Sequence, residues 1–395
     1  MFSQFMRLFI CCFLVFFLTA CQLVEIPKAQ TITFTNSNSE VRLYAIRSQP
    51  GLYASNIGLN FILTGDLLAL VTPSAKAQLT QVLGVDSFNT IAAMSNQEVV
   101  LIKTSSNNLQ EMIGQLEAVD GIEQVQPDHY IKKQLDQATK PVSNPQNDAL
   151  PILELPIPSQ CPEPLRSVRV ALIDNGFDFR HEAFRDTKVL LHYDADNLIE
   201  IGGTPNKRLG HGTAMAGVIL AKNFSTGEEG IAPASEIIAI EQASSKLSSM
   251  LLGFSVARMM TADIVNCSWL MEFKSDLLVS FIQDWQAQEN PAFIVTAAGN
   301  GSKDACLANK LSLIPEVLTI GSINSEKKLS TFSNYGPCVD LFVPSSHMSI
   351  HETGYITASS TSASAAFFTG LLARNLQCGL QKSELHQKLF KNHIN

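Results

Sequence analysis

The pattern of apolar and polar residues divides most of the chain into two folded regions. Between about residues 64 and 133, short apolar runs alternate with segments in which apolar residues recur every three or four positions. The pattern predicts a small α+β domain of ferredoxin-like type over residues 60–133, with the order strand, helix, strand, strand, helix, strand. The stretches read in this way are DLLALVTP, SAKAQLTQVLGV, FNTIAAM, EVVLIKT, NNLQEMIGQLEAV and IEQVQPD. Residues 22–60 have no readable pattern.

A different pattern begins near residue 166, where the apolar runs become nearly continuous and have the length of strands. Helix-like stretches such as HGTAMAGVILAKN and LLGFSVARMM separate several of them. Buried strands that alternate with helices are typical of a parallel sheet. We therefore expect residues 166–395 to form an α/β domain on a doubly wound, mostly parallel sheet. Residues 134–165 are rich in Pro, Asn and Gln, which predicts a linker.

The first residues resemble an export signal. Arg7 is followed by an apolar run that is too short to span a membrane comfortably, and then by small residues, which predicts a signal peptide over residues 1–20. The letters LTAC that end at Cys21 resemble the lipobox of bacterial lipoproteins. This resemblance implies export, a lipid anchor on Cys21 and, because Gln22 follows, sorting to the outer membrane. An ordinary signal cut nearby and an uncleaved anchor are the alternatives.

Composition narrows the class of protein. Hydrophobic residues make up 46% and charged residues 16%, which indicates a sizeable core and argues against disorder. The net charge of −8 and the lack of a basic run make nucleic acid a poor candidate partner. Five of the eight cysteines follow Cys21, and in an oxidising compartment some of them are expected to pair. Cys267 lies in an apolar run and is expected to be a buried free thiol.

Four polar residues stand where a parallel sheet places functional groups. Asp174 ends the strand VALID, Asn300 closes VTAAGN, and His211 begins a helix in LGHGTAMAG. Such carboxyl ends of strands gather at one edge of the sheet. Ser362 lies in the small-residue run ASSTSASAA. Taken singly, each residue is more often a turn, a cap or part of a packed helix, so only their combination has weight.

Six segments between residues 170 and 370 resemble, in order, the segments of subtilisin-type serine peptidases. They are VALIDNGFDFRHEAF, GHGTAMAGVI, GIAPASEIIAI, VTAAGN, LSTFSNYGPCVDLFVPSS and SSTSASAAFFTG. The resemblance implies Ser362 as nucleophile, His211 as general base and Asp174 as the group that orients the imidazole. It also implies that Asn300 and the Ser362 backbone N–H stabilise an oxyanion. A protein or peptide substrate and no cofactor are expected.

The resemblance also implies a substrate-binding edge formed by Ser268, Trp269, Leu270 and Gly299. The stretch NCSWLM is bulkier than the small residues usual in the family. We expect a constricted, apolar pocket and narrow specificity. The alternative is that Trp269, Leu270 and Met271 turn into the core.

Several positions depart from the pattern of the family. Ser360 stands where the family has Gly, which predicts a strained or narrowed corner, and Ala366 stands where it has Pro. Asn175 replaces the usual Ser or Thr beside the aspartate. Ala183 and Phe224 stand at two positions that often supply oxygen ligands to calcium, so no metal is expected there.

The cysteine pattern adds one expected disulfide. Cys306 and Cys338 stand where some relatives have such a bond. Cys161 and Cys378 flank the second domain and are a further candidate pair, although spacing alone does not establish connectivity.

Together these observations predict an exported, lipid-anchored serine endopeptidase made as a self-processing zymogen. The domain at 60–133 resembles the inhibitory propeptide of the family, with a cut expected near residues 132–136. The lipid lies on the propeptide side of that cut, so the propeptide either retains the enzyme non-covalently or releases it. A pseudoenzyme that binds peptides without cutting them is the main alternative. A peptide ligase, or a protein that only processes itself, is another.

Overall fold

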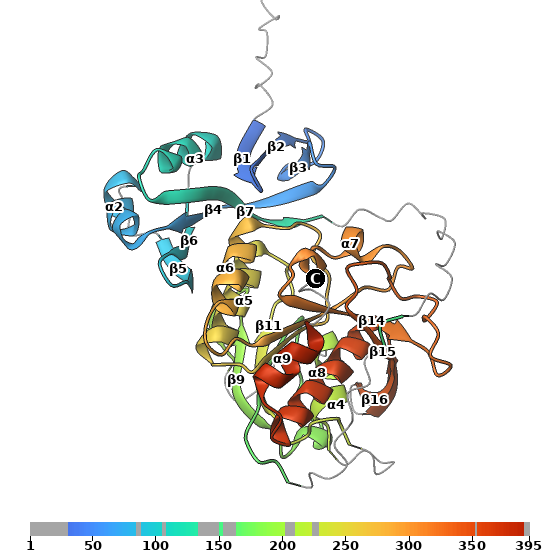
Figure 1. Cartoon of the computed structure of the whole chain (residues 1–395). Coiled ribbons are helices and arrows are strands. Elements are labelled where there is room, and N and C mark those ends of the chain that lie inside the picture. Colours follow the sequence, from blue (N-terminus) through green and yellow to red (C-terminus); the bar gives the residue numbers. More distant parts are fainter. Residues whose placement is uncertain are drawn as a thin grey trace, which may run out of the picture.

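The structure is a computed structural model of the whole chain in which two β-sheets lie on either side of a pair of helices (Figure 1). It describes residues 31–83, 88–104, 108–132, 150–152, 163–201, 210–222, 229–351 and 354–390. The expected signal peptide, Cys21, Cys161 and Phe224 lie outside these residues. Within them, no helix has the length and apolar character needed to cross a membrane.

The larger sheet has eight strands in the order β10-β9-β11-β8-β12-β13-β14-β15. Every neighbouring pair is parallel except β10 with β9, so the expected α/β class with a mostly parallel sheet is confirmed. The strands are β8 (Arg169–Asp174), β9 (Lys188–Asp194), β10 (Ile199–Glu200), β11 (Glu236–Glu241), β12 (Ile264–Cys267), β13 (Phe293–Ala297), β14 (Val317–Ile323) and β15 (Leu341–Pro344).

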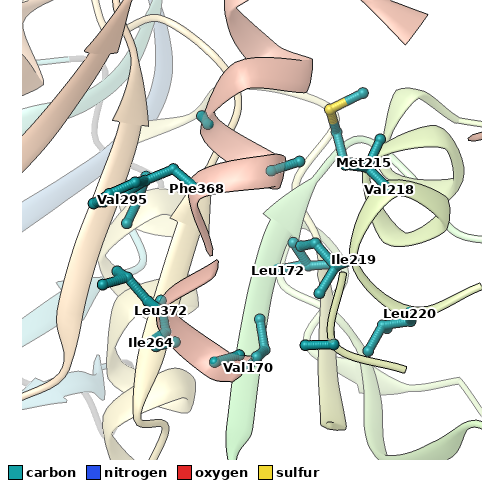
Figure 2. Close-up of a cluster of buried hydrophobic side chains, with 14 of the residues drawn as sticks. Val170, Leu172, Met215, Val218, Ile219, Leu220, Ile264, Val295, Phe368 and Leu372 are labelled. Atoms are coloured by element: carbon teal, nitrogen blue, oxygen red, sulfur yellow. The ribbon is translucent and has the colours of Figure 1, made fainter. Parts of the chain in front are cut away.

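Helices cover both faces of this sheet, which explains why its strands are apolar at nearly every position. On one face, Val170 and Leu172 of β8 pack with Phe368 and Ile219 (Figure 2). On the other face, the alternate residues Ala171 and Ile173 of β8 belong to a cluster with residues of two further helices. The first face carries α4 (His211–Leu220), α8 (Thr361–Gln377) and α9 (Lys382–Leu389), and the second carries α5 (Leu247–Met259) and α6 (Asp276–Gln286).

The domain that contains the smaller sheet has the six elements that the sequence pattern predicts for residues 60–133. Its strand order β7-β4-β6-β5 is that of a ferredoxin-like unit, and all of these pairs are antiparallel. The elements are β4 (Asn60–Val71), α2 (Pro73–Leu83), β5 (Phe88–Ala93), β6 (Glu98–Ile102), α3 (Leu109–Glu117) and β7 (Ile122–Ile131).

Three strands precede this unit, within residues 22–60, where the sequence has no readable pattern of apolar and polar residues. They are β1 (Thr31–Asn36), β2 (Ser39–Ala45) and β3 (Leu52–Ser55). β1 and β2 form a hairpin whose two turn residues, Ser37 and Asn38, have φ angles of 52° and 57°. Positive φ at both positions is typical of a tight two-residue hairpin, which usually carries Asn-Gly rather than Ser-Asn. β3 pairs with the start of β4, so the domain begins by residue 31 and not at 60.

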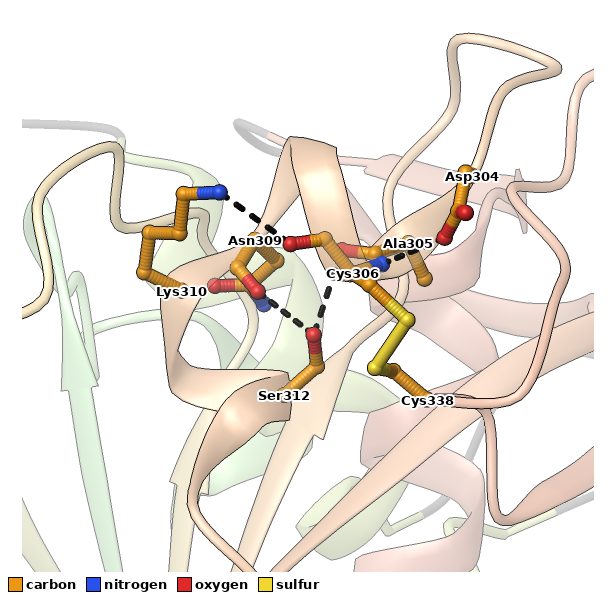
Figure 3. Close-up of a disulfide and its surroundings, with 7 residues drawn as sticks. All are labelled: Asp304, Ala305, Cys306, Asn309, Lys310, Ser312 and Cys338. Atoms are coloured by element: carbon orange, nitrogen blue, oxygen red, sulfur yellow. Dashed lines mark hydrogen bonds between the residues drawn. A yellow bond between two sulfur atoms is a disulfide. The ribbon is translucent and has the colours of Figure 1, made fainter. Parts of the chain in front are cut away.

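The second domain contains the expected disulfide. Cys306 in α7 (Ala305–Ala308) is bonded to Cys338, and Asp304 caps the same helix by accepting a hydrogen bond from the Cys306 N–H (Figure 3). Cys267 is free and buried, as expected. Cys378 is disulfide-bonded as well, and its expected partner lies outside the described residues.

Part of the predicted linker belongs with the parallel sheet. The Phe342 N–H in the edge strand β15 donates to the Pro151 carbonyl at 3.0 Å, and Leu150 and Ile152 pack against the cluster that contains Phe342. An open sheet edge exposes unpaired backbone groups, so this contact covers a vulnerable strand. Residues 150–152 therefore adjoin the second domain, which was expected to begin at residue 166.

Candidate active site

The order of strands brings two functional segments together at one edge of the sheet. From β8 the chain passes to β9 and β11 on one side, and it then returns to β12 on the other side of β8. Such a reversal point, at the carboxyl ends of parallel strands, is where open α/β sheets bind ligands. Asp174 is the last residue of β8, and Ser268 follows the last residue of β12.

Asp174 and His211 form a hydrogen-bonded pair at this edge. The Nδ1 atom of His211, the first residue of α4, lies 2.9 Å from Asp174 Oδ2 and 3.0 Å from Oδ1. The carboxylate is buried, whereas 38% of the imidazole is exposed. A neutral imidazole that donates from Nδ1 carries its free lone pair on Nε2. The pair can therefore accept a proton at Nε2 and stabilise the resulting charge.

The same pair determines how His211 titrates. Partial burial lowers the pKa of His211, but the hydrogen bond and the negative charge of Asp174 outweigh it, so the pKa is raised above its ordinary value. An imidazole with such a pKa is a stronger base once it is neutral.

Asn175 holds His211 in place through the backbone. Its Oδ1 accepts a hydrogen bond from the His211 N–H at 2.8 Å, and thus caps a helix whose own preceding residue, Gly210, has no side chain. A Cβ atom on Gly210 would lie 2.5 Å from this Oδ1 and 2.5 Å from the Gly176 carbonyl oxygen. The residue after Asp174 is therefore tied directly to the start of α4.

The first turn of α8 leaves one backbone donor unused at Ser362. The Thr361 N–H donates to Asn300 Oδ1 at 2.8 Å, and the Ala363 N–H donates to Ser360 Oγ at 3.1 Å. Among the described residues the Ser362 N–H has no acceptor. A free N–H at a helix N-terminus, where the helix dipole is positive, favours a negatively charged oxygen.

Thr361 orients the side chain of Asn300. Asn300 Oδ1 accepts hydrogen bonds from both the N–H and the hydroxyl of Thr361, and the hydroxyl in turn accepts one from the Gly299 N–H. With its oxygen held there, the amide presents Nδ2 as a donor that bonds no other described residue. In the sequence, the only signal for this role of Thr361 is its position next to Ser362.

The hydroxyl of Ser362 bonds to Ser268, a residue of the expected substrate-binding edge. It donates to the Ser268 carbonyl at 3.1 Å, while the Ser268 hydroxyl donates to the Ser362 carbonyl at 3.1 Å. Among the described residues it makes no hydrogen bond to His211. Catalytic hydrogen bonds are often long or misaligned without substrate, and rotation about χ1 redirects a serine hydroxyl.

The sequence profile of the subtilase family matches residues 166–393, which is more than half of the chain. The chain belongs to the subtilase family. The match contains Asp174, His211, Asn300 and Ser362.

Several relatives of this subtilase are serine proteases. It is 28% identical over 227 residues to the thermophilic serine proteinase of Bacillus sp. (strain AK1), a match that covers 56% of this chain and 55% of that protein. It is 25% identical over 247 residues to the major intracellular serine protease of Bacillus subtilis (strain 168), with 57% and 76% covered. This subtilase therefore spans about half the length of the first relative.

A solved structure of a cold-adapted subtilisin-like serine proteinase also matches the subtilase. Its sequence identity is 29% and its TM-score 0.49, and the match covers 57% of this chain and 81% of that one.

Two of the three bulky side chains at the expected substrate edge of this subtilase turn into the core. The Trp269 indole N–H donates to the Ile173 carbonyl at 2.8 Å, and the ring packs against the core cluster of α5 and α6. Met271 is buried in the same cluster, and its N–H donates to Asn309 Oδ1. For these two residues the structure favours the alternative that bulky side chains turn into the core.

Leu270 is only partly buried and lies beside Gly299, another residue of the expected substrate-binding edge. A Cβ atom built on Gly299 would lie 3.2 Å from Leu270 Cδ2 and 3.3 Å from Cδ1, so the leucine fills the space beside this glycine. Gly299 has a φ of 103°, which residues other than glycine rarely adopt. The predicted apolar constriction of the subtilase therefore depends on Leu270.

The expectation that Ser360 strains the nucleophile corner is wrong. Its φ of −170° is extended backbone that any residue adopts, and its hydroxyl serves as the N-cap of α8. Ala366 lies buried within the unbroken helix.

In the part of the chain that the structure describes, no three His, Cys, Asp or Glu side chains are grouped to hold a metal ion. Ala183 lies in the short helix η1 (Glu182–Phe184).

Replacing Asn175 should slow the reaction of the subtilase without preventing folding. In Asn175→Ala the His211 N–H loses its acceptor, and the loss of a helix cap costs about 1 kcal/mol. If this whole cost falls on the position of His211 in the transition state, the rate decreases about fivefold. We expect kcat to fall with little change in KM. Asn175→Asp places a negative charge beside His211 and should move the acidic limb of the pH profile upward. Asn324→Ala, which removes a similar cap in a distant turn, is the control. Unchanged kinetics and an unmoved limb would show that Asn175 does not position His211.

The raised pKa of His211 has a defined effect on the pH profile. The imidazole acts as a base only when neutral, so kcat/KM should rise with pH and reach half its maximum above 6.5, the ordinary value for histidine. Asp174→Asn removes the charge and should lower both the rate, by about 10⁴-fold, and the pKa. NMR titration of His211 in the Ser362→Ala variant measures the pKa without turnover. A midpoint at or below 6.5 contradicts the prediction.

Proposed function

We propose that this subtilase is a serine endopeptidase that acts through Ser362, His211 and Asp174. The observation that carries the proposal is the combination of a bonded Asp–His pair with two unused donors, the Ser362 N–H and Asn300 Nδ2, at the start of α8. This is the arrangement that acyl transfer needs, because it supplies a base, a nucleophile and a site for an oxyanion. The relatives named above are proteases and support the same reaction.

Each proposed role follows from an atom. His211 Nε2 takes the proton of the Ser362 hydroxyl as the oxygen attacks the scissile carbonyl, and the C–N bond breaks when the imidazolium returns the proton to the leaving amine. Water then attacks the acyl-enzyme with the same base and releases the carboxylate. The Ser362 N–H and Asn300 Nδ2 hold the oxyanion, and loss of one such donor reduces kcat by about 10²- to 10³-fold. The substrate is a protein or peptide, and Leu270 restricts the side chain bound beside Gly299.

The proposal extends to the making of the enzyme. The N-terminal domain acts as an intramolecular inhibitor, and the chain is cut near residues 132–136, just beyond β7. Export and a lipid anchor at Cys21, with an outer-membrane location, belong to the same proposal. The disulfide between Cys306 and Cys338 supports it, because stable disulfides are typical of oxidising compartments.

One observation favours a second candidate, a subtilase that binds peptides without cutting them. Ser362 is 7% exposed, and its hydroxyl donates to the Ser268 carbonyl, the group that a substrate strand would approach. If that bond persisted with a peptide bound, the hydroxyl would not reach the base.

A fluorophosphonate probe separates the two candidates. It reacts with an activated serine, so the purified protein should be labelled once on Ser362 and should hydrolyse unstructured protein. Ser362→Ala should abolish both, whereas Ser359→Ala, a change of an exposed neighbouring serine, should preserve them. Asn300→Ala should retain labelling but lose most of the hydrolysis. Folded, processed protein that binds peptides but is never labelled would establish the binding protein instead.

Mass spectrometry of protein from the membrane fraction tests processing and anchoring together. We expect two fragments, one beginning at an acylated Cys21 and one beginning near residues 132–136. In Ser362→Ala the chain should remain single but acylated, because signal cleavage does not depend on its own serine. Cys21→Ala should lose the acyl chains while the internal cut persists. A mature protein with no acyl chain or no internal cut contradicts the corresponding half of the proposal.

A further inference from the structure

The N-terminal domain has its sheet buried on both faces, but only one face is covered by its own helices. In β4 and β6, Leu67 and Val100 point to α2 and α3, while Leu68 and Val99 point the other way. This second set of side chains shares a cluster with residues of α5 and α6 in the catalytic domain. Figure 1 shows the strands of this sheet beside those two helices. Its members are Leu68, Leu70, Ile91, Val99 and Leu101 on one side and Leu251, Phe254, Leu278 and Phe281 on the other.

The catalytic domain in turn completes the core of the N-terminal domain. Phe273 is 7% exposed and belongs to the cluster formed by the N-terminal domain. Its ring centroid lies 5.4 Å from that of Phe61, 5.3 Å from that of His129 and 6.3 Å from that of Phe34. Removing either domain would therefore open a cavity in the other, as well as expose an apolar surface.

Polar contacts attach the N-terminal domain to the starts of two helices. Asp128 in β7 accepts hydrogen bonds from the N–H and hydroxyl of Ser248, at 2.9 and 2.8 Å, in the first turn of α5. Asn36 in β1 accepts one from the Asp276 N–H at 3.0 Å and donates to the Lys274 carbonyl at 2.9 Å, at the start of α6. The β1–β2 hairpin, which lies outside the ferredoxin-like unit, thus supplies the second attachment.

A third contact holds the opposite end of the domain. Arg258 and Asp284 form an ion pair of 2.8 Å, and both reach the β5–β6 turn. Arg258 donates to the Ala93 carbonyl at 3.1 Å, and Asp284 accepts from the Ser95 N–H at 3.0 Å. The contacts therefore extend across the whole domain, from the hairpin to the far turn.

We propose that the N-terminal domain, residues 31–132, is a permanent subunit of the mature enzyme and not an inhibitor that leaves it. The cut inferred above lies beyond β7, so hydrolysis of that one peptide bond breaks none of these contacts. In this proposal, activation removes only the segment after Lys132, while the domain itself stays bound. If Cys21 is lipidated, this subunit also keeps the catalytic domain on the membrane. The proposal depends on the proposed function only for the cut.

Nicking an inactive full-length chain tests this without using its own activity. A recognition site for an unrelated, site-specific protease is placed within residues 134–149 of the Ser362→Ala protein, and the chain is then cleaved. The nicked protein is diluted to about 10 nM, where a complex with a micromolar dissociation constant would separate, and passed through a sizing column. We expect both fragments to elute as one particle, and separate peaks would overturn the proposal. If the two nicked fragments elute together but the wild-type protein has no peptidase activity, only the proposed function is refuted.

Matched variants of the nicked protein locate the attachment. Phe273→Ala and Asn36→Ala should each raise the dissociation constant by at least about tenfold, because aromatic and buried polar contacts dominate such interfaces. Met259→Ala removes a side chain that is 77% exposed and should have no effect. Asn36→Ala leaves both cores intact, so it remains informative if Phe273→Ala does not fold. If Asn36→Ala binds as tightly as the unmodified nicked protein, the hairpin attachment is wrong.

Discussion

The site depends on the hydrogen bonds at the start of α8. A helix leaves its first N–H groups without internal partners, and here Asn300 and Ser360 accept two of the first three. The remaining one belongs to the residue that carries the proposed nucleophile. The hydrogen bonds from Thr361 to Asn300 Oδ1 also orient the Asn300 amide. The start of α8 therefore determines both donors of the proposed oxyanion site, the Ser362 N–H and Asn300 Nδ2. Without these hydrogen bonds, the pair of Asp174 and His211 would lack a positioned serine and an oxyanion site beside it.

A second constraint comes from packing. The parallel sheet is covered by α4 and α8 on one face and by α5 and α6 on the other, and the helices of the second face are themselves covered by the N-terminal sheet. This arrangement puts apolar clusters on both sides of α5 and α6. The N-terminal domain therefore forms an outer layer over the core of the parallel sheet.

The departures from the pattern of the family have local explanations. Ser360 replaces a glycine at no backbone cost, because the residue is extended, and it gains a capping role. Asn175 caps α4 from the neighbouring strand end, a task that Gly210 is unable to perform. Both changes hold the first turn of a helix that carries a proposed catalytic residue, where small displacements would move the reacting atoms most.

Much of this protein follows from its sequence by itself. Buried strands alternating with helices determine an α/β sheet, and the chain order of Asp174, His211, Asn300 and Ser362 identifies the candidate site, because parallel strands end at one edge. Residues 67–71 of β4 and 99–102 of β6 are apolar at every position, which the structure explains by burial of the sheet on both faces. Tertiary structure alone decided what covers the second face, where Trp269 and Met271 turn, and which N–H at α8 stays free. Those outcomes depend on contacts between residues far apart in the chain, for which the local period of a sequence contains no record.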